Sequence, residues 1–289
     1  MKILGTGLNG LVGSRIVELL NSSFEFENIS RSTGVDIADP DQVLKALKES
    51  SAEIVLHLAA KTDVDGCEKD KDLGKNGESW RINVDGTKNV SRACEKTGKK
   101  LIYVSTDFVF DGEIEEGQFY SEDSKPNPVN WYAMTKYEGE KAVQQSSCSW
   151  TIARLAYPYR ANFEKPDFFR AIKKRLESAQ PVVAVTDQIF TPTFIDDFAH
   201  CLKILIENNT TGIYHTVGGD FLSPFDAANI IAETFGLDKN LIIKTTREEF
   251  FKDRAPRPFR LALKNAKIES FGARNSTFRE GVLRIKEQL

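Results

Sequence analysis

Along the chain, short apolar runs of strand length alternate with segments whose apolar residues recur at helical spacing. Two such runs are "IVLHLAA" (54–60) and "LIYVST" (101–106), and amphipathic segments follow each of them, the first spanning 78–98. This order predicts a parallel sheet with helices on both faces. Because the two runs are almost wholly apolar, they are typical of central strands that are buried on both sides. The predicted fold class is therefore α/β, a Rossmann-type doubly wound parallel sheet.

The alternation of strands and helices loosens after residue 157, which predicts two regions. We expect a dinucleotide-binding domain over 1–157, with its sheet extended by two short strands within 181–217. The small C-terminal lobe, formed by 158–180 and 218–289, is expected to bind the substrate. Helices are predicted near 166–177, near 194–207 and within 223–236. No flexible linker separates the two regions, so we expect them to pack together.

Composition narrows the class of protein. The chain has 289 residues, of which 40% are hydrophobic and 28% charged, and its net charge of −3 does not favour nucleic-acid binding. No apolar run reaches the roughly 18–20 residues of a membrane span, and no secretory signal follows Met1. The four cysteines and three histidines are scattered. We therefore expect a cytoplasmic protein with reduced thiols and no metal site.

The first chemical motif is a glycine triad between the first strand and the first helix. "LGTGLNGLVG" spaces Gly7, Gly10 and Gly13 by three residues. Such glycines permit a tight turn, a close approach of the backbone to a pyrophosphate, and close packing of helix on strand. The helix N-terminus then presents N–H donors to the phosphates. We predict a dinucleotide site here; the alternative is a strand–helix turn without a ligand.

The residues after the second strand bear on the choice of cofactor. An acidic residue at this tip would select NAD, but the chain has Ser30 and Arg31 instead. Arg31 could bind a 2′-phosphate, which favours NADPH, with NADH as the alternative. The other interpretation is that Arg31 is a solvated loop residue. Asp39 and Pro40 are typical of a helix N-cap and first turn, whereas Asp36 has no such duty and is expected to face the adenine.

A tyrosine and a lysine four residues apart form the second motif. Tyr132 and Lys136 share one face of a predicted helix, where a cation can lower the pKa of a phenol and prepare it for acid–base chemistry. Alone, this spacing is common on solvated helices. Ser105, Thr106 and Asp107, however, stand at the carboxyl end of a central strand, where open α/β sheets bind ligands. A hydroxyl, a phenol, a cation and a dinucleotide together favour hydride transfer to a ketone.

These motifs resemble the extended short-chain dehydrogenase/reductase superfamily and, within it, the dTDP-4-dehydrorhamnose reductase family. The resemblance covers most of the chain. It rests on "TGLNGLVG" (6–13), "DIAD" (36–39), "LAAKTDVDGCE" (58–68), "STDFVFDG" (105–112), "YAMTK" (132–136), "ARLAYPY" (153–159), "DQIFTPT" (187–193) and "RAPRPFRLAL" (254–263). The glycine loop and the Tyr-Lys pair are superfamily-wide, whereas 105–112 and 187–193 are more specific.

The resemblance implies roles for single positions. Tyr132 would be the proton donor and also a cofactor contact. Lys136 would be its tuning cation and a ligand of the nicotinamide ribose, and Thr106 the hydroxyl that holds the carbonyl. Around the cofactor, we expect Gly7, Asn9, Gly10, Leu11 and Val12 at the pyrophosphate, Ser30 and Arg31 at the 2′ position, Asp36 and Ile37 at the adenine, and Leu58, Ala59, Ala60 and Lys61 along its border. The sugar would face Thr62, Val64, Asp107 and Tyr157.

The small lobe is expected to hold the nucleotide diphosphate. The segment "RAPRPFR" supplies Arg254, Arg257 and Arg260, and arginine forks suit a diphosphate. Of these we select Arg257; the alternative is a solvated basic loop. The chain departs from the family at Tyr157, where tryptophan is usual, and at Phe190, where glycine is usual. These departures leave the redox chemistry intact but leave the identity of the sugar open.

The implied reaction is NADPH-dependent reduction of the C4 ketone of a nucleotide-linked 4-keto-6-deoxy sugar by a homodimer. One alternative is an NAD-dependent nucleotide-sugar epimerase or dehydratase of the same superfamily. Epimerases usually carry a serine-rich stretch ending in "VYG" where this chain has "STDFVFDG". The other is a non-catalytic NADP-binding regulatory subunit like the beta subunit of methionine adenosyltransferase. A degenerate site would favour that role, but Thr106, Tyr132 and Lys136 are all present.

Overall fold

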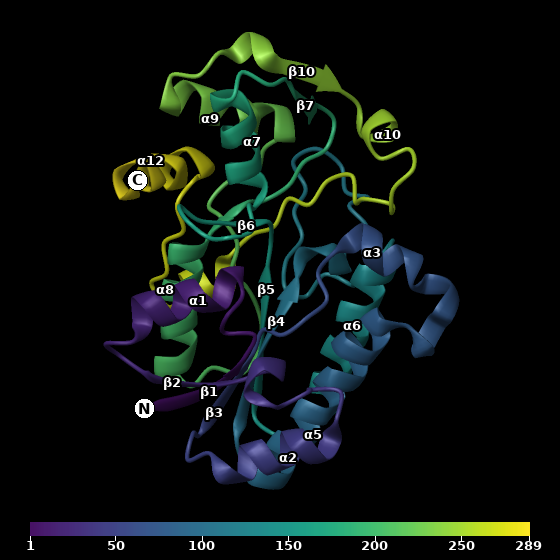
Figure 1. Ribbon diagram of the computed structural model, residues 1–289, viewed down its shortest axis with the longest axis vertical. Helices are drawn as coiled ribbons and strands as arrows, with labels where there is room; N and C mark the ends of the chain where they lie inside the picture. Colours follow the sequence, from purple (N-terminus) through teal and green to yellow (C-terminus); the bar gives the residue numbers. More distant parts are fainter.

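A six-stranded parallel sheet forms the centre of the larger lobe in the computed structural model, which describes residues 1–289 (Figure 1). The strand order is β2-β1-β3-β4-β5-β9. The strands are β1 (Lys2–Thr6), β2 (Glu25–Ile29), β3 (Ile54–His57), β4 (Lys100–Thr106), β5 (Trp150–Leu155) and β9 (Gly212–His215). Every residue of β3 and β4 is buried, as their apolar sequences predict. The predicted α/β class with a parallel Rossmann-type sheet is confirmed.

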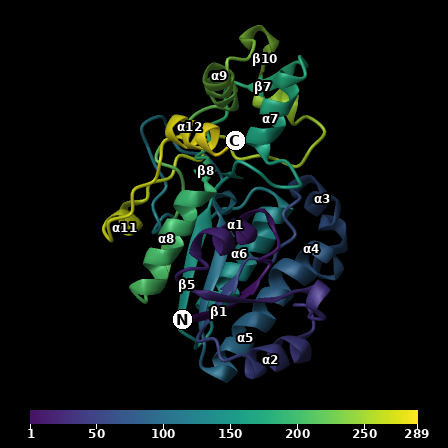
Figure 2. The same cartoon turned by 60° about the vertical axis from the view of Figure 1, so that its left-hand side comes forward.

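Helices cover both faces of this sheet (Figures 1 and 2). On one face lie α1 (Leu11–Leu20) and α8 (Ile195–Glu207), and on the other α2 (Pro40–Glu49), α5 (Thr87–Thr97) and α6 (Trp131–Gln144). Each set buries its apolar stripe in a separate core, with Ile16 and Leu202 in the first and Val43 and Leu47 in the second. Full burial of one such side chain stabilises the fold by about 1.5–3 kcal/mol.

The cap predicted for α2 is confirmed, since the Asp39 carboxylate accepts hydrogen bonds from the N–H groups of Asp41 and Gln42 and Pro40 begins the helix.

The connection from β3 to α5 contains more short elements than expected. It contains α3 (Val64–Lys69), η2 (Lys71–Asn76), α4 (Glu78–Trp80) and a π-helical turn, η3 (Arg81–Gly86). The helix predicted over 78–98 is therefore present but widened near its start, a feature often found beside functional sites.

The smaller lobe stands above the carboxyl edge of the sheet (Figure 2). Its helices are α7 (Phe168–Glu177), α9 (Pro224–Phe235), α10 (Arg247–Phe250) and α12 (Phe278–Gln288). It also has two pairs of short parallel strands. These are β6 (Pro158–Tyr159) with β8 (Thr193–Phe194), and β7 (Val182–Val185) with β10 (Ile242–Thr245). An aromatic core that includes Tyr159, Phe169 and Phe278 holds it together. None of the helices combines the length and apolar character that a membrane crossing requires.

The predicted division of the chain needs two corrections. Of the two strands expected to extend the sheet from 181–217, β9 does so beside β5, but β7 pairs with β10 in the small lobe. The reason is that only one face of β7 is buried, with Val183 46% exposed, whereas an inner strand of the large sheet is covered on both faces. In addition, α11 (Ala266–Glu269) packs against β9, and Ile268 lies in the core of the large lobe.

Candidate active site

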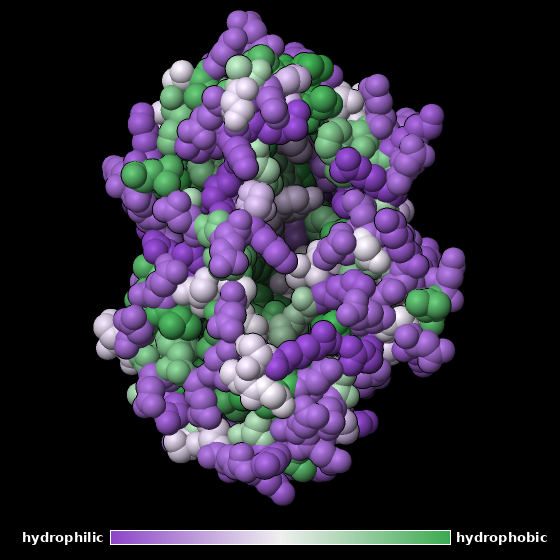
Figure 3. Space-filling view, in the orientation of Figure 1, coloured by the Kyte–Doolittle hydropathy of each residue, from purple (hydrophilic) through white to green (hydrophobic).

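A cavity of about 490 Å³ lies at the carboxyl edge of the sheet, where the two lobes meet. The surface is hollowed at this level in the space-filling view (Figure 3). Its wall combines the glycine loop, the ends of β3, β4 and β5, helix α6 and the start of α7. Segments far apart in the sequence thus converge at the position where open parallel sheets bind ligands.

The glycine loop has the geometry of a phosphate cradle. Gly7 adopts a φ of +76°, and a Cβ atom there would lie 2.8 Å from the backbone nitrogen of Ala59. A Cβ atom at Gly13 would lie 2.5 Å from the carbonyl oxygen of Gly7. Gly10 begins α1 with no side-chain cap, and the first turn carries no acidic residue. The helix N-terminus therefore keeps its donors for an anion, so the loop fits the pyrophosphate of a dinucleotide.

A buried polar network fixes the loop that faces these glycines. The Asn83 side chain accepts a hydrogen bond from the Lys61 N–H at 2.8 Å and donates to the Lys61 carbonyl at 3.0 Å and to Thr135 Oγ1 at 2.9 Å. His57 bridges Thr6 and Thr87, with contacts of 2.6 and 3.0 Å. The loop at 58–61 is thereby tied both to the sheet and to α6.

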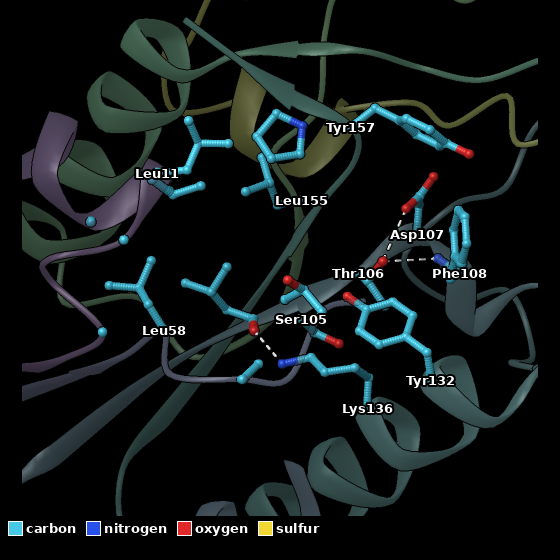
Figure 4. Close-up of a pocket in the computed structure, with 18 of the residues that line it drawn as sticks. Leu11, Leu58, Ser105, Thr106, Asp107, Phe108, Tyr132, Lys136, Leu155 and Tyr157 are labelled. Atoms are coloured by element: carbon cyan, nitrogen blue, oxygen red, sulfur yellow. Dashed lines mark hydrogen bonds between the residues drawn. The ribbon is translucent and has the colours of Figure 1, made fainter. Parts of the chain in front are cut away.

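Three side chains with complementary chemistry meet at the centre of the cavity (Figure 4). Thr106 ends β4, and its hydroxyl donates to Asp107 Oδ1 at 3.1 Å. Tyr132 and Lys136 project from the same face of α6, as their spacing predicts. The helix begins where the Asn130 side chain accepts a hydrogen bond from the Ala133 N–H at 2.8 Å. A hydroxyl, a phenol and an amine therefore surround one space.

Burial sets the protonation of this group. It raises the pKa of the Tyr132 phenol well above its ordinary value, with Thr106 acting in the opposite direction. It also lowers the pKa of Lys136 to about 7, opposed by the charge of Glu140. Burial dominates the pKa of Tyr132 in this structure, where the Lys136 ammonium donates to the Val104 carbonyl at 2.8 Å. The expectation that a charged Lys136 lowers the pKa of Tyr132 stays a prediction.

Asp107 is a buried carboxyl group in the cavity wall. It is 1% exposed, and its Oδ2 atom has no hydrogen-bond partner. Burial raises its pKa to about 7, while the hydrogen bond from Thr106 lowers it. Near neutral pH the group can therefore serve as a donor or as an acceptor.

Aromatic rings form the wall on the side of the small lobe. Tyr157 has a φ of +38°, which is unusual for a residue other than glycine and is typical of functional sites. Its ring centroid lies 5.7 Å from that of Phe108, 6.2 Å from that of Phe168 and 4.8 Å from that of Phe190. Phe190, which departs from the family pattern, thus packs directly against Tyr157, the other departure.

The cavity brings together most of the positions predicted from the sequence. Those that line it are Gly7, Gly10, Leu11, Val12, Leu58, Ala59, Ala60, Thr62, Val64, Thr106, Asp107, Tyr132, Lys136 and Tyr157. Outside its lining are Asn9, Ser30, Arg31, Asp36, Ile37, Lys61 and Arg257. Ser30, Arg31 and Asp36 lie beyond the end of β2, whereas Ile37 is buried in the core beneath α2.

Two predicted ligands are engaged with protein carboxylates. Lys61 pairs with Glu78 at 2.7 Å and with Asp70 at 3.4 Å. Arg257 donates to Asp65 on α3 at 2.8 Å, and its side chain is only 10% exposed. In this conformation neither cation is directed into the cavity.

Sequence reasoning missed several lining residues from the segment that joins the two lobes. These are Leu155, Pro158, Asp167 and Phe168, together with Phe108 after β4. Asp167 caps α7 by accepting from the Arg170 N–H at 2.9 Å. The sequence predicts this helix near 166–177, but nothing local in the sequence indicates that its start faces the glycine loop.

A dinucleotide cradle that opens onto a hydroxyl, a phenol and an ammonium defines a nicotinamide-dependent oxidoreductase of the short-chain dehydrogenase/reductase class. Comparison with known proteins supports this class and narrows it. The chain belongs to the RmlD substrate binding domain family, whose family model matches residues 1–289. The predicted resemblance and the predicted NAD(P)-dependent oxidoreductase are both confirmed.

Individual relatives are similar over most of the chain. The dTDP-4-dehydrorhamnose reductase of Mycobacterium tuberculosis is 28% identical, covering 89% of this chain and 81% of that protein. The spore coat polysaccharide biosynthesis protein SpsK of Bacillus subtilis is 29% identical, covering 97% of this chain and 95% of that protein. The beta subunit of methionine adenosyltransferase 2 from Xenopus tropicalis is 26% identical, covering 97% and 86%.

Solved structures agree with this assignment. The dTDP-4-dehydrorhamnose reductase of Bacillus anthracis, in complex with NADP, has a TM-score of 0.90 and 28% identity, covering 100% of this chain and 99% of that chain. A reductase ortholog from Clostridium acetobutylicum also has a TM-score of 0.90, with 30% identity and the same coverage. The predicted likeness to dTDP-4-dehydrorhamnose reductase is therefore confirmed.

Proposed function

We propose that this protein reduces the C4 ketone of a nucleotide-linked 4-keto-6-deoxy sugar with NADPH. The observation that carries the proposal is the convergence of Thr106, Tyr132 and Lys136 beside the glycine loop in one cavity. When bound, NADPH supplies a hydride to the carbonyl carbon. The family and the reductases among its relatives support this reaction.

The chain's own groups supply the proton and hold the oxygen. The Tyr132 phenol carries its proton at neutral pH, since burial raises a pKa that already lies above neutrality, and it donates that proton to the oxygen of the reacting carbonyl. The Thr106 hydroxyl donates a hydrogen bond to the same oxygen. Lys136, when charged, stabilises the phenolate that remains. The negative charge that develops is thus shared by groups already in place.

The remaining expected contacts belong to the same proposal. Asp107, Thr62, Val64 and Tyr157 would face the sugar, and all four line the cavity. Ser30 and Arg31 would contact the 2′-phosphate. Arg257 would have to break its ion pair with Asp65 before it could bind the diphosphate, and breaking this partly buried pair costs free energy. We also propose a homodimer, which light scattering on the purified protein tests.

An assay at 340 nm on dTDP-4-keto-6-deoxy sugar, with NADPH and NADH in parallel, tests the function. Rapid oxidation of NADPH with formation of the 4-hydroxy sugar is expected. Oxidation with NADH alone would reverse the cofactor preference but keep the chemistry. No turnover with either cofactor, for this sugar and for related keto sugars, would contradict the proposal.

The similarity to a regulatory beta subunit makes a second test worthwhile. A non-catalytic subunit would bind NADP and co-purify with a synthetase without reducing any keto sugar. The intact hydroxyl, phenol and amine favour catalysis, since a protein that only binds a partner does not require them. An epimerase or dehydratase would instead convert its nucleotide sugar without net oxidation of added NADPH.

A further inference from the structure

A cluster of two arginines around one carboxylate lies outside the cavity lining, beyond the end of β2. Asp36 Oδ2 accepts a hydrogen bond from Arg81 Nη1 at 3.1 Å, and Arg31 Nε lies 3.6 Å from the same oxygen. Asp36 Oδ1 accepts from the Ala38 N–H at 3.0 Å. Arg81 begins the π-helical turn η3, 45 residues away from Asp36.

The cluster stands next to the glycine loop. Strands β1 and β2 run in parallel with Thr6 opposite Ile29, so Gly7 and Ser30 leave the sheet side by side. The chain then turns through η1 (Arg31–Thr33) before it reaches Asp36. In dinucleotide-binding folds the residue after this strand meets the adenosine ribose. The arginines are therefore close to the position of the ribose 2′ substituent.

The charges in this cluster do not cancel. Two guanidinium groups face one carboxylate, and both of its oxygens are already engaged. Glu78, which the charge of Arg31 also reaches, pairs with Lys61 at 2.7 Å. The ion pair with Asp36 engages one nitrogen of each arginine, and the Arg31 and Arg81 side chains are 58% and 43% exposed. Both arginines therefore keep donors for a further anion.

Hydroxyl groups complete the surroundings. Ser30 Oγ and Ser32 Oγ lie 2.8 Å apart at the same tip. A phosphate monoester is a dianion whose oxygens take bidentate hydrogen bonds from arginine, and two arginines with serine hydroxyls suit it. An adenosine ribose without the phosphate presents only a 2′-OH, which prefers a free carboxylate acceptor. Asp36 is a weaker acceptor for it here, because its two oxygens already accept from the Ala38 N–H and from Arg81.

We propose that Arg81 is a cofactor-specificity residue that binds the 2′-phosphate of NADPH together with Arg31, both being held in place by Asp36. The inference rests on the proposed use of NADPH and names the group that selects it. It also replaces the expectation that Asp36 faces the adenine freely. A cofactor lacking the phosphate would leave both arginines on Asp36, so NADH can bind, but without these contacts.

Equilibrium binding to the full chain tests the inference without any turnover. Adenosine 2′,5′-bisphosphate and 5′-AMP differ only in the 2′-phosphate, and calorimetry measures both. For Arg81→Gln we expect the bisphosphate to bind about tenfold more weakly and 5′-AMP to bind as before, as the loss of a charge-assisted contact predicts. Arg81→Lys, which keeps the charge but loses the fork, should fall between Arg81→Gln and the parent protein.

The controls separate this role from others. Arg92→Gln, an exposed arginine on the neighbouring helix α5, should leave both affinities unchanged. Equal weakening of both ligands in Arg81→Gln would assign Arg81 to the adenine or to the fold and overturn the inference, as would no change in either. Because the binding test uses no sugar substrate, it can still be interpreted if the proposed ketoreductase reaction is not observed.

Discussion

The Lys136 ammonium group donates a hydrogen bond to the Val104 carbonyl oxygen at 2.8 Å. Val104 precedes Thr106 by two residues on β4, so this bond fixes the helix that carries the phenol to the strand that carries the hydroxyl. Burial keeps the pKa of the Tyr132 phenol above its ordinary value. In this form the site is ready to donate a proton, as a reductase requires.

Removal of the phenol hydroxyl should therefore abolish most of the chemistry. We expect Tyr132→Phe to lower kcat by about 10²–10⁴-fold, since this is the usual contribution of a positioned general acid. Affinity for NADPH, measured by equilibrium fluorescence, should change little, because the ring stays packed against Phe108.

Tyr137→Phe is the matched control for this prediction. Tyr137 lies five residues further along the same helix and contacts Lys141, with the Lys141 ammonium 4.8 Å from its ring centroid. Its substitution should leave kcat near that of the parent protein. Full turnover in Tyr132→Phe would assign the proton to another group.

The second prediction concerns the pH dependence of reduction. The pKa of Lys136 is lowered to about 7 by burial, so the ammonium is lost as pH rises through that value. Because a charged Lys136 is needed to stabilise the forming phenolate, kcat/KM should be highest below pH 7. Above it, kcat/KM should decline by about tenfold per pH unit. A stopped-flow or initial-rate profile from pH 5.5 to 9 measures this.

Lys136→Arg identifies the group that titrates. Arginine stays charged throughout this range, so the variant should be slower but should lack the decline. If the variant keeps the same decline, the titration belongs to a different residue. The first to test is Asp107, whose pKa is also about 7.

Local patterns in the sequence were sufficient for the parts of the site that depend on neighbouring residues. The apolar runs predict β3 and β4 because both strands are buried on both faces. Spacing places Tyr132 and Lys136 on one helix face, and the glycine triad locates the start of α1. Each of these features is set by the geometry of one strand, one helix or one turn.

Features that depend on distant segments could not be predicted in this way. The strand β7 is short and apolar, and only packing decides that it pairs with β10. Arg257 looked free in the sequence, but its partner Asp65 lies 192 residues away. Likewise, the direction of the Lys136 ammonium depends on a carbonyl of another element, and the pKa of Tyr132 is set mainly by how deeply the phenol is buried.

The third prediction tests the buried carboxyl group through stability. The folded-state pKa of Asp107, about 7, lies above its ordinary value of 3.8, so the folded protein binds more protons between these values. This contribution to stability is fully present below the ordinary pKa and is lost as pH rises through about 7. Because Asp107→Asn removes it, the Tm of the variant should rise relative to that of the parent between pH 5 and pH 8.

Differential scanning calorimetry at the two pH values measures the effect. Asp123→Asn is the control, since that carboxylate is exposed and pairs only with Lys267. Its Tm difference from the parent should not change with pH in this range. A pH-independent difference for Asp107→Asn would mean that Asp107 is ionised throughout.

The fourth prediction separates two costs of replacing a glycine in the cofactor loop. Gly7 and Gly98 both have positive φ, +76° and +66°. A Cβ atom at Gly98 meets nothing within 4 Å, whereas at Gly7 it would lie 2.8 Å from the Ala59 nitrogen. Gly98→Ala should therefore cost only the backbone strain, about 1–2 kcal/mol, and leave NADPH binding unchanged. Gly7→Ala should cost more and should also weaken NADPH binding, because the loop at 58–61 must move.

Urea unfolding and cofactor titration measure the two effects. Equal stability losses with unchanged binding in both variants would mean that the close approach of Gly7 to Ala59 has no part in forming the dinucleotide site.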